Sequence, residues 1–229
     1  MIGIIGAMSE EVEALKTLMC VKKEEKKLDY TYYTGLIANR ECVLVQGGIG
    51  KVNAAISATL LFEKYPIDYL INIGSAGGLD LKQNVGDVVI SNAISYHDVD
   101  VTAFNYEYGQ MAGQPQQFKP STSLMNICQQ VLTTLNQTVH IGLIVSGDTF
   151  VSKQSHVDTI LYHFPEAICV EMEAAAIAQV STVYNIPFII IRSLSDIFNK
   201  GENEIQFDEY IQKASQASAK MCKRVIEQL

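Results

Sequence analysis

One pattern recurs along the chain: a short apolar run is followed by a turn rich in Gly or Ser and then by helical periodicity. The runs are Ile2–Ile5, Cys42–Val45, Tyr69–Ile73, His140–Val145, Ala167–Val170 and Phe188–Ile191. Uninterrupted Val, Ile and Leu runs are typical of strands that are buried on both faces, so helices must cover both sides of the sheet. Strands that alternate with helices predict an α/β fold with a mostly parallel central sheet.

A less apolar stretch, Tyr30–Thr34, lies close to Cys42–Val45, and we expect the two to pair as a hairpin that makes the sheet mixed. Val88–Ile90 is a further strand. No internal repeat, low-complexity segment or linker interrupts the pattern, so we expect a single domain over residues 1–229. Helices are expected at about Glu10–Met19, from Gly50 to about Lys64, at Ala174–Val183 and at about Phe207–Gln228.

The composition argues against several classes of protein. A net charge of −8 disfavours non-specific binding to nucleic acid, which needs clustered Lys and Arg, and binding to an anionic membrane surface. No stretch approaches the ~18 apolar residues of a membrane span and no signal peptide is visible, so we expect a cytoplasmic protein. An odd number of widely spaced cysteines argues against a disulfide framework or a zinc site: Cys20, Cys42, Cys128, Cys169 and Cys222.

The histidines carry no metal-site spacing either. His97, Asp98 and Asp100 have suitable side chains, but no second His lies nearby, so we expect neither a metal nor a cofactor.

Ligands of open α/β sheets bind beyond the carboxyl ends of the strands, so the residues that follow each apolar run are the candidates for a site. Glu11 also suits the dipole of a first helical turn, and Asp196 also suits a turn or helix cap. Glu171 and Glu173 face the same way if both are extended, whereas a bend at the helix start would separate them. The candidates are Met8, Glu11, Gly47–Gly50, Ser75–Gly78, Ser146–Val151, Glu171–Glu173 and Arg192–Asp196.

Separated carboxylates on one rim suit hydrolysis at a glycosidic carbon. One carboxyl group acts as an acid on the leaving group, and the other activates a water on the opposite face. From the residues alone the prediction stops at an α/β enzyme with acidic catalysis.

Seven motifs, in order along essentially the whole chain, resemble those of the bacterial 5′-methylthioadenosine/S-adenosylhomocysteine nucleosidase family. They are IGIIGAM at 2–8, GIGKVN at 48–53, NIGSAGG at 72–78, YHDVDVTAF at 96–104, SGD at 146–148, VEME at 170–173 and SD at 195–196. The resemblance implies the mixed sheet, flanked by helices, of the purine nucleoside phosphorylase-like superfamily. It also implies hydrolysis of both nucleosides, and of 5′-deoxyadenosine, to adenine and the sugar product.

The resemblance further implies roles for the catalytic residues. Glu11 would activate the attacking water, with polar support from Ser75 and Arg192. Asp196, oriented by Ser195, would protonate the five-membered-ring nitrogen of adenine. Asp196 must then hold a proton near neutral pH, which an apolar strand end favours, whereas Glu11 must be ionised, which Arg192 favours.

Binding residues are implied in the same way. Glu173 would accept hydrogen bonds from the ribose hydroxyls while Met172 packs on the sugar, and Phe150 would stack on adenine while the backbone of Val151 bonds its edge. Gly77 would be a further binding residue, and an alkylthio pocket would be lined by Met8, Ile49 and Phe207. The resemblance also implies a homodimer, in which a loop near Val101–Ala112 of the partner subunit completes that pocket. The residues of this loop that would enter it are Val101, Phe104 and Tyr106. Two departures affect this pocket: Ala112 stands where the family often has Pro, and Phe198–Glu202 is one residue longer than in some relatives.

The arginines favour water over phosphate as the nucleophile. Of Arg40, Arg192 and Arg224, only Arg192 falls on the predicted rim, and one Arg is a weak cradle for a dianion. The alternatives are a nucleosidase for another substrate such as aminodeoxyfutalosine, a phosphorylase, and a nucleoside-binding protein without turnover.

Overall fold

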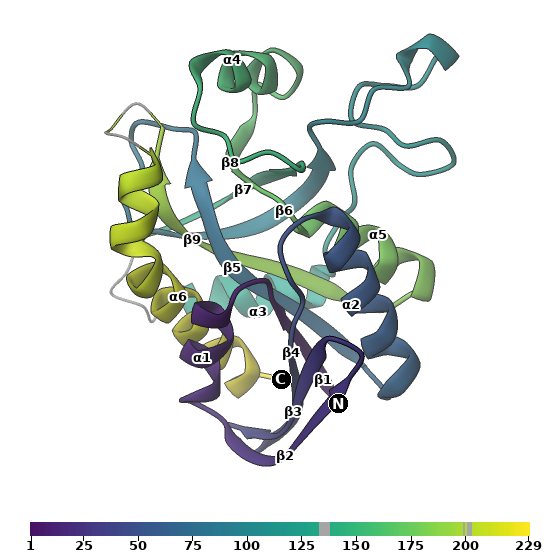
Figure 1. Ribbon diagram of the computed structural model, residues 1–229, viewed down its shortest axis with the longest axis vertical. Coiled ribbons are helices and arrows are strands. Elements are labelled where there is room, and N and C mark those ends of the chain that lie inside the picture. The colour runs from purple at the N-terminus through teal and green to yellow at the C-terminus, as the bar shows by residue number, and fades with distance from the viewer. Residues whose placement is uncertain (133–137, 199, 201–202) are drawn as a thin grey trace.

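The computed structural model describes residues 1–132, 138–198, 200 and 203–229 (Figure 1). In this part of the chain one sheet of nine strands has the order β2-β3-β4-β1-β5-β8-β7-β6-β9. The strands are β1 (Ile2–Gly6), β2 (Cys20–Lys27), β3 (Tyr30–Ile37), β4 (Arg40–Gln46), β5 (Tyr69–Gly78), β6 (Val88–Tyr96), β7 (Val139–Ser146), β8 (Ala167–Glu171) and β9 (Phe188–Ile197). The helices are α1 (Ser9–Lys16), α2 (Lys51–Lys64), the 3₁₀ turn η1 (Thr102–Phe104), α3 (Thr122–Leu132), α4 (Gln154–His163), α5 (Ala174–Tyr184) and α6 (Asn203–Glu227).

The hairpin expected near the N-terminus is confirmed. β3 pairs antiparallel with β4, and the two residues of the turn, Ala38 and Asn39, have φ of 49° and 63°. Positive φ at both central positions matches the twist of a tight hairpin. The preceding strand β2 was not predicted, because it is an exposed edge strand of Lys and Glu and so lacks an apolar run.

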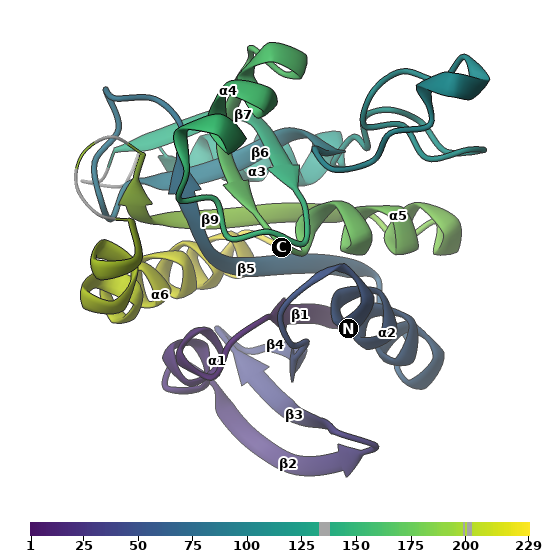
Figure 2. The ribbon, with the colours of Figure 1, turned by 45° about the horizontal axis from the view of Figure 1, so that its top comes forward.

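The second half of the sheet closes on itself. β5 pairs antiparallel with β8 and parallel with β9, and β9 pairs antiparallel with β6. With the parallel pairs β6–β7 and β7–β8, these five strands form a ring, which Figure 2 shows beside the open part of the sheet. The sheet is mixed, as predicted, but its barrel-like closure was not.

The core lies on both faces of the strands, because alternate residues enter two different clusters. Ile4 and Leu44 pack in one cluster with buried residues of α1, α3 and α6, whereas Ile5 and Val45 pack in the other with α2 and α5. Each fully buried aliphatic side chain contributes about 1.5–3 kcal/mol to stability. No helix in the described ranges is both long and apolar enough to cross a membrane.

Two strands are longer than predicted, and this changes the location of the site. β5 continues through Ser75 and Gly77 to Gly78, and β9 continues through Asp196 to Ile197, where turns were expected. The second halves of these strands mix Gly, Ser and charged residues with isolated apolar ones, so hydropathy alone does not mark them as strands. They are ordered by pairing with each other inside the ring, Gly77 opposite Asp196.

Candidate active site

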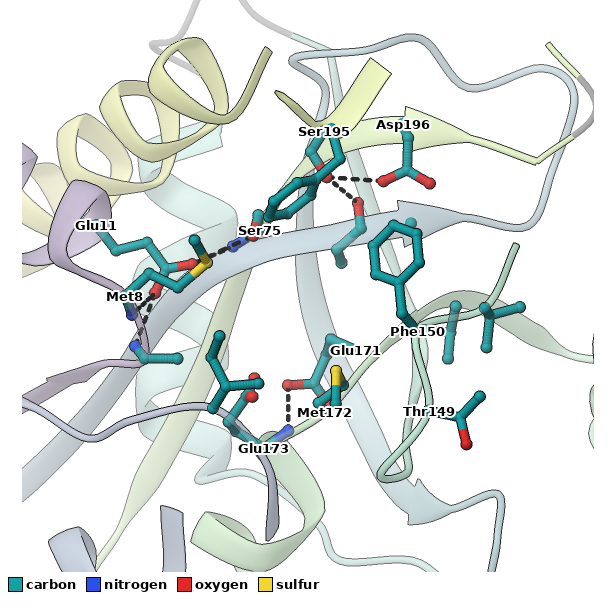
Figure 3. Close-up of a pocket in the computed structure, with 17 residues that line it drawn as sticks. Met8, Glu11, Ser75, Thr149, Phe150, Glu171, Met172, Glu173, Ser195 and Asp196 are labelled. Atoms are coloured by element: carbon teal, nitrogen blue, oxygen red, sulfur yellow. Dashed lines mark hydrogen bonds between the residues drawn. The ribbon is translucent and has the colours of Figure 1, made fainter. Parts of the chain in front are cut away.

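A cavity of about 290 Å³ lies where β1, β5, β8 and β9 approach one another, and the predicted residues gather around it (Figure 3). All the residues to which the family resemblance gives a role line it except Arg192, Val101, Phe104 and Tyr106. Ala76, Thr149 and Glu171 also line it from the candidate segments, and the structure adds Ala7 and Val170, which were not predicted. None of the described residues that line the cavity is Lys or Arg.

Glu11 stands at the start of α1, where free backbone donors converge on its carboxylate. Its Oε2 accepts hydrogen bonds from the N–H groups of Ala7 at 2.7 Å and Met8 at 3.1 Å. Its Oε1 accepts from the N–H of Ser75 at 3.0 Å and from the Ser75 hydroxyl at 3.2 Å. These bonds fix the carboxylate against β5 and aim it into the cavity.

Burial raises the pKa of Glu11 above its ordinary value. The nearby charge of Arg192 and the backbone N–H donors oppose this effect, as expected for Arg192, but burial outweighs them. A buried carboxylate with a raised pKa is a stronger proton acceptor than an exposed one. Glu11 is therefore suited to take a proton from a water in the cavity.

Arg192 lies behind the cavity wall and is 1% exposed. Its guanidinium donates to Glu171 Oε2 at 2.7 Å and to Asn72 Oδ1 at 2.6 Å. A Cβ at Gly74 would stand 3.2 Å from both Arg192 Cζ and Glu11 Oε1, so only glycine lets these groups approach β5 closely. Arg192 thus acts on Glu11 through its charge. The parts played by Asn72 and Gly74 were not predicted, because neither residue type signals an ion-pair support.

Glu171 and Glu173 have different surroundings, because the chain bends between β8 and α5. Glu171 Oε2 accepts from the N–H groups of Glu173 at 3.0 Å and Ala174 at 2.9 Å, and the Ser146 hydroxyl donates to its Oε1. Glu171 therefore neutralises Arg192 and anchors the start of α5. Of the alternatives left open by the sequence, the bend that separates the two carboxylates is the one observed.

Glu173 faces the cavity and is 7% exposed. Its Oε1 accepts from the N–H of Gly50 at 2.9 Å, and burial, followed by the charge of Glu171, raises its pKa. Gly50 has φ of +91°, and a Cβ there would lie 3.0 Å from Asp148 Oδ1. Glycine is thus required at this turn, which also supplies a donor to the site.

A β-bulge in β9 presents the second carboxylate. The register passes from Ala76 opposite Leu194 to Gly77 opposite Asp196, so Ser195 is an extra residue in β9. Both Ser195 and Asp196 line the cavity, and the Ser195 hydroxyl donates to Asp196 Oδ1 at 2.8 Å (Figure 3). A Cβ at Gly77 would stand 3.1 Å from Asp196 Oδ2, so this glycine leaves room for the carboxyl group.

Aromatic rings close the side of the cavity near Asp196. Phe150 and Phe207 meet edge to face, with ring centroids 5.7 Å apart and an interplanar angle of 80°. Figure 3 shows Phe150 on the side of Asp196, and Glu11 on the opposite side of the cavity. The cavity can therefore hold a flat apolar group beside one carboxyl group while the other carboxylate faces a water.

The residues expected to act across a dimer lie apart from this cavity. Phe104 is 74% exposed in the loop after β6, which extends away from the body of the molecule (Figures 1 and 2). Ala112 lies in the same loop. The segment Phe198–Glu202 falls partly outside the described residues.

The sequence and the fold of this chain are similar to those of known proteins. Residues 1–227 match the model of the phosphorylase superfamily. A 5′-methylthioadenosine/S-adenosylhomocysteine nucleosidase of Staphylococcus aureus is 47% identical over 229 residues, which cover 100% of both chains. The nucleosidase of Neisseria meningitidis, solved with methylthio-immucillin-A, is 41% identical with a TM-score of 0.95, covering 100% of this chain and 99% of that one. The futalosine hydrolase of Helicobacter pylori is 29% identical with a TM-score of 0.94, covering 100% and 97%.

Proposed function

The chain belongs to the phosphorylase superfamily and, within it, to the 5′-methylthioadenosine/S-adenosylhomocysteine nucleosidases, and we propose that it hydrolyses the N-glycosidic bond of these nucleosides and of 5′-deoxyadenosine. The observation that carries the proposal is the pair of buried carboxyl groups, Glu11 and Asp196, on opposite sides of one cavity. The products are adenine and the corresponding thioribose, or 5-deoxyribose from 5′-deoxyadenosine. The activity is assigned to the whole chain, residues 1–229, as one domain.

Asp196 is the general acid of the proposed mechanism. Breakage of the bond between the sugar and the base leaves its electron pair on adenine, so a proton must reach the five-membered-ring nitrogen. The Ser195 hydroxyl orients Asp196 for this transfer. Phe150 stacks on the adenine ring, and the backbone of Val151 bonds its edge, which supports the base beside the acid.

Glu11 is the general base. It takes a proton from a water that attacks the anomeric carbon as positive charge develops on the sugar. Glu173 accepts hydrogen bonds from the ribose hydroxyls, and Met172 packs on the sugar. Met8, Ile49 and Phe207 are the apolar wall against which the alkylthio group lies.

Water is favoured over phosphate by the charges around the cavity. Arg192 is buried against Glu171, and the described lining residues include no Lys or Arg to hold a dianion. Purified protein is therefore expected to release adenine from methylthioadenosine at the same rate in phosphate-free buffer and with added phosphate. Release only with phosphate would make the enzyme a phosphorylase. Binding without release in either buffer would favour a nucleoside-binding protein.

A panel of nucleosides separates this substrate class from that of the futalosine hydrolase. The greater identity to methylthioadenosine/S-adenosylhomocysteine nucleosidases, 47% against 29%, favours the thioether nucleosides. Turnover of aminodeoxyfutalosine alone would reverse this choice.

The proposed enzyme is a cytoplasmic homodimer that needs no nucleic acid or membrane partner. Exposed apolar side chains support the dimer: Val52 on α2, Val183 on α5 and Phe104 in the loop near Val101–Ala112. Figures 1 and 2 show α2, α5 and this loop on one side of the molecule. Exposed apolar surface of this kind is typical of a protein–protein interface. Val101, Phe104 and Tyr106 would then reach the alkylthio pocket of the partner.

Light scattering is expected to give twice the mass of one chain. The variant Phe104→Asp is expected to shift the protein toward monomer, because it places a charge in an apolar interface. The same variant is expected to raise KM, since the pocket of the partner loses a wall. A wild-type monomer at every concentration would contradict the proposal.

A further inference from the structure

Two segments that line the cavity, before α2 and after β7, are joined outside it to each other and to the segment after β6 by a Lys and two Asp side chains. Lys51, at the start of α2, places its Nζ 2.6 Å from Asp98 Oδ2 and 3.7 Å from Asp148 Oδ2. Asp98 Oδ2 also accepts from the N–H of Asp148 at 2.9 Å, and Asp148 Oδ1 accepts from the N–H of Lys51 at 2.8 Å. We call these three residues the Lys51 cluster.

The Lys51 cluster lies next to two groups that contact the substrate in the proposed function. Gly50, whose N–H donates to Glu173, immediately precedes Lys51, so the hydrogen bond from Lys51 to Asp148 restrains this turn. Phe150, the stacking ring, comes two residues after Asp148. The ribose side and the adenine side of the cavity are thus tied to each other through one cation.

Asp98 extends the connection to a third segment. It follows β6 by two residues and precedes the loop near Val101–Ala112. Beneath the cluster, the ring of Tyr96 lies 5.6 Å from Lys51 Nζ, and its hydroxyl donates to Gln179 on α5 at 2.7 Å. Lys51 therefore lies over a buried ring that is itself hydrogen-bonded to α5.

We propose that Lys51, Asp98 and Asp148 are positioning residues, which hold the donor of Gly50 and the ring of Phe150 at the separation that the nucleoside requires. The proposal rests on the proposed function, because it takes ribose and adenine as the groups bound. None of the three residues lines the cavity, so they act through Gly50, Glu173 and Phe150.

A positioning role differs from a purely stabilising one in its kinetic effect. Lys51 and Asp98 are partly exposed and Asp148 is half-exposed, and ion pairs in such places add little to stability. Glu173 and Phe150 contact the nucleoside both before and during bond breakage. Their displacement weakens the ground state and the transition state alike, which raises KM and leaves kcat nearly unchanged.

The chain offers a matched control at the other end of α2. Lys64, the last residue of the helix, pairs with Glu25 at 2.6 Å, the same length as the Lys51–Asp98 pair, and does not line the cavity. Lys51→Met is expected to raise KM for methylthioadenosine by at least about fivefold, with kcat within about threefold of wild type. Lys64→Met is expected to leave both constants within about twofold. The Kd for adenine, measured by calorimetry, is expected to rise in the first variant only.

Two further variants test whether the cluster acts as a unit. Lys51→Arg, which keeps the cation, is expected to restore KM to within about threefold of wild type. In the double variant Lys51→Met/Asp98→Asn, the rise in KM is expected to be smaller than the product of the two single effects, because both substitutions break the same contact.

The outcomes separate the cluster from the proposed function. An unchanged KM and adenine Kd in Lys51→Met, with an active wild type, would overturn the positioning role. Equal effects in Lys51→Met and Lys64→Met would also overturn it and leave only general stabilisation. A wild type that binds adenine but cleaves no thioether nucleoside would reject the proposed function, and the adenine Kd values would still test the cluster. If Lys51→Met does not fold, Asp98→Asn serves for the same measurement.

Discussion

Asp196→Asn is expected to lower kcat for adenine release by at least about 10²-fold, the scale of lost general-acid catalysis. The amide is close in size to the carboxyl group and can still accept the hydrogen bond that Ser195 donates at 2.8 Å. It cannot supply the proton that adenine needs as the glycosidic bond breaks. The expected loss is therefore in kcat, measured by steady-state adenine release, with KM changing little.

A change of leaving group provides the sharper control. A thioribosyl substrate that carries p-nitrophenolate needs no protonation of its leaving group, so Asp196→Asn is expected to cleave it nearly as fast as wild type. Asp158→Asn, on the exposed face of α4 away from the cavity, controls for the substitution itself. Near-wild-type release of adenine by Asp196→Asn would remove Asp196 from the role of acid.

Glu11→Gln is expected to be as damaging, with kcat lowered by at least about 10²-fold. The oxygen of the glutamine amide can accept from Ser75, but its NH₂ group would face the N–H donors of Ala7 and Met8. The variant thus loses the proton acceptor and gains a donor where the structure supplies donors. Glu10→Gln is the matched control, because Glu10 lies in the same helical turn and does not line the cavity.

The pH profile distinguishes loss of the base from simple misplacement. Glu11 accepts a proton only when it is ionised, so activity falls as the pH drops through its pKa. Burial raises the pKa of Glu11, and this acid limb is therefore expected at a higher pH than the ordinary Glu value would give. Glu11→Gln is expected to lack the limb. A variant that keeps both the limb and the rate would exclude Glu11 as the base.

The parts of the fold that apolar patterning specifies were predictable. The runs at β1, β4, β7 and β8 mark strands, and the helix expected to end at about Lys64 does so. The charged edge strand β2 was not predictable in this way, nor were the second halves of β5 and β9, in which Gly, Ser and charged residues interrupt the apolar run. Their order depends on partners that are distant in the sequence, and hydropathy does not record such pairing.

The same distinction holds for the site. The motifs that resemble a known family predicted that Glu11, Glu173 and Asp196 share one site, and all three line the same cavity. The motifs did not reveal that Glu171 would instead pair with Arg192 and accept hydrogen bonds from backbone N–H groups at the start of α5. The different roles of Glu171 and Glu173 depend on a bend of the backbone between them and on which donors each carboxylate faces. The sequence shows only two Glu residues separated by one residue, so it does not distinguish them.

The extra residue in β9 makes the proposed general acid, Asp196, sensitive to a change in the length of the strand as well as to a change in residue type. A regular strand sends consecutive side chains to opposite faces, whereas the bulge lets Ser195 and Asp196 face the cavity together. Deletion of one residue from this part of the strand would restore the alternation and turn one of the pair away from adenine. Catalysis could then be lost in a relative that retains every carboxylate. Inactive descendants of this fold should be sought through gaps in an alignment as well as through substitutions.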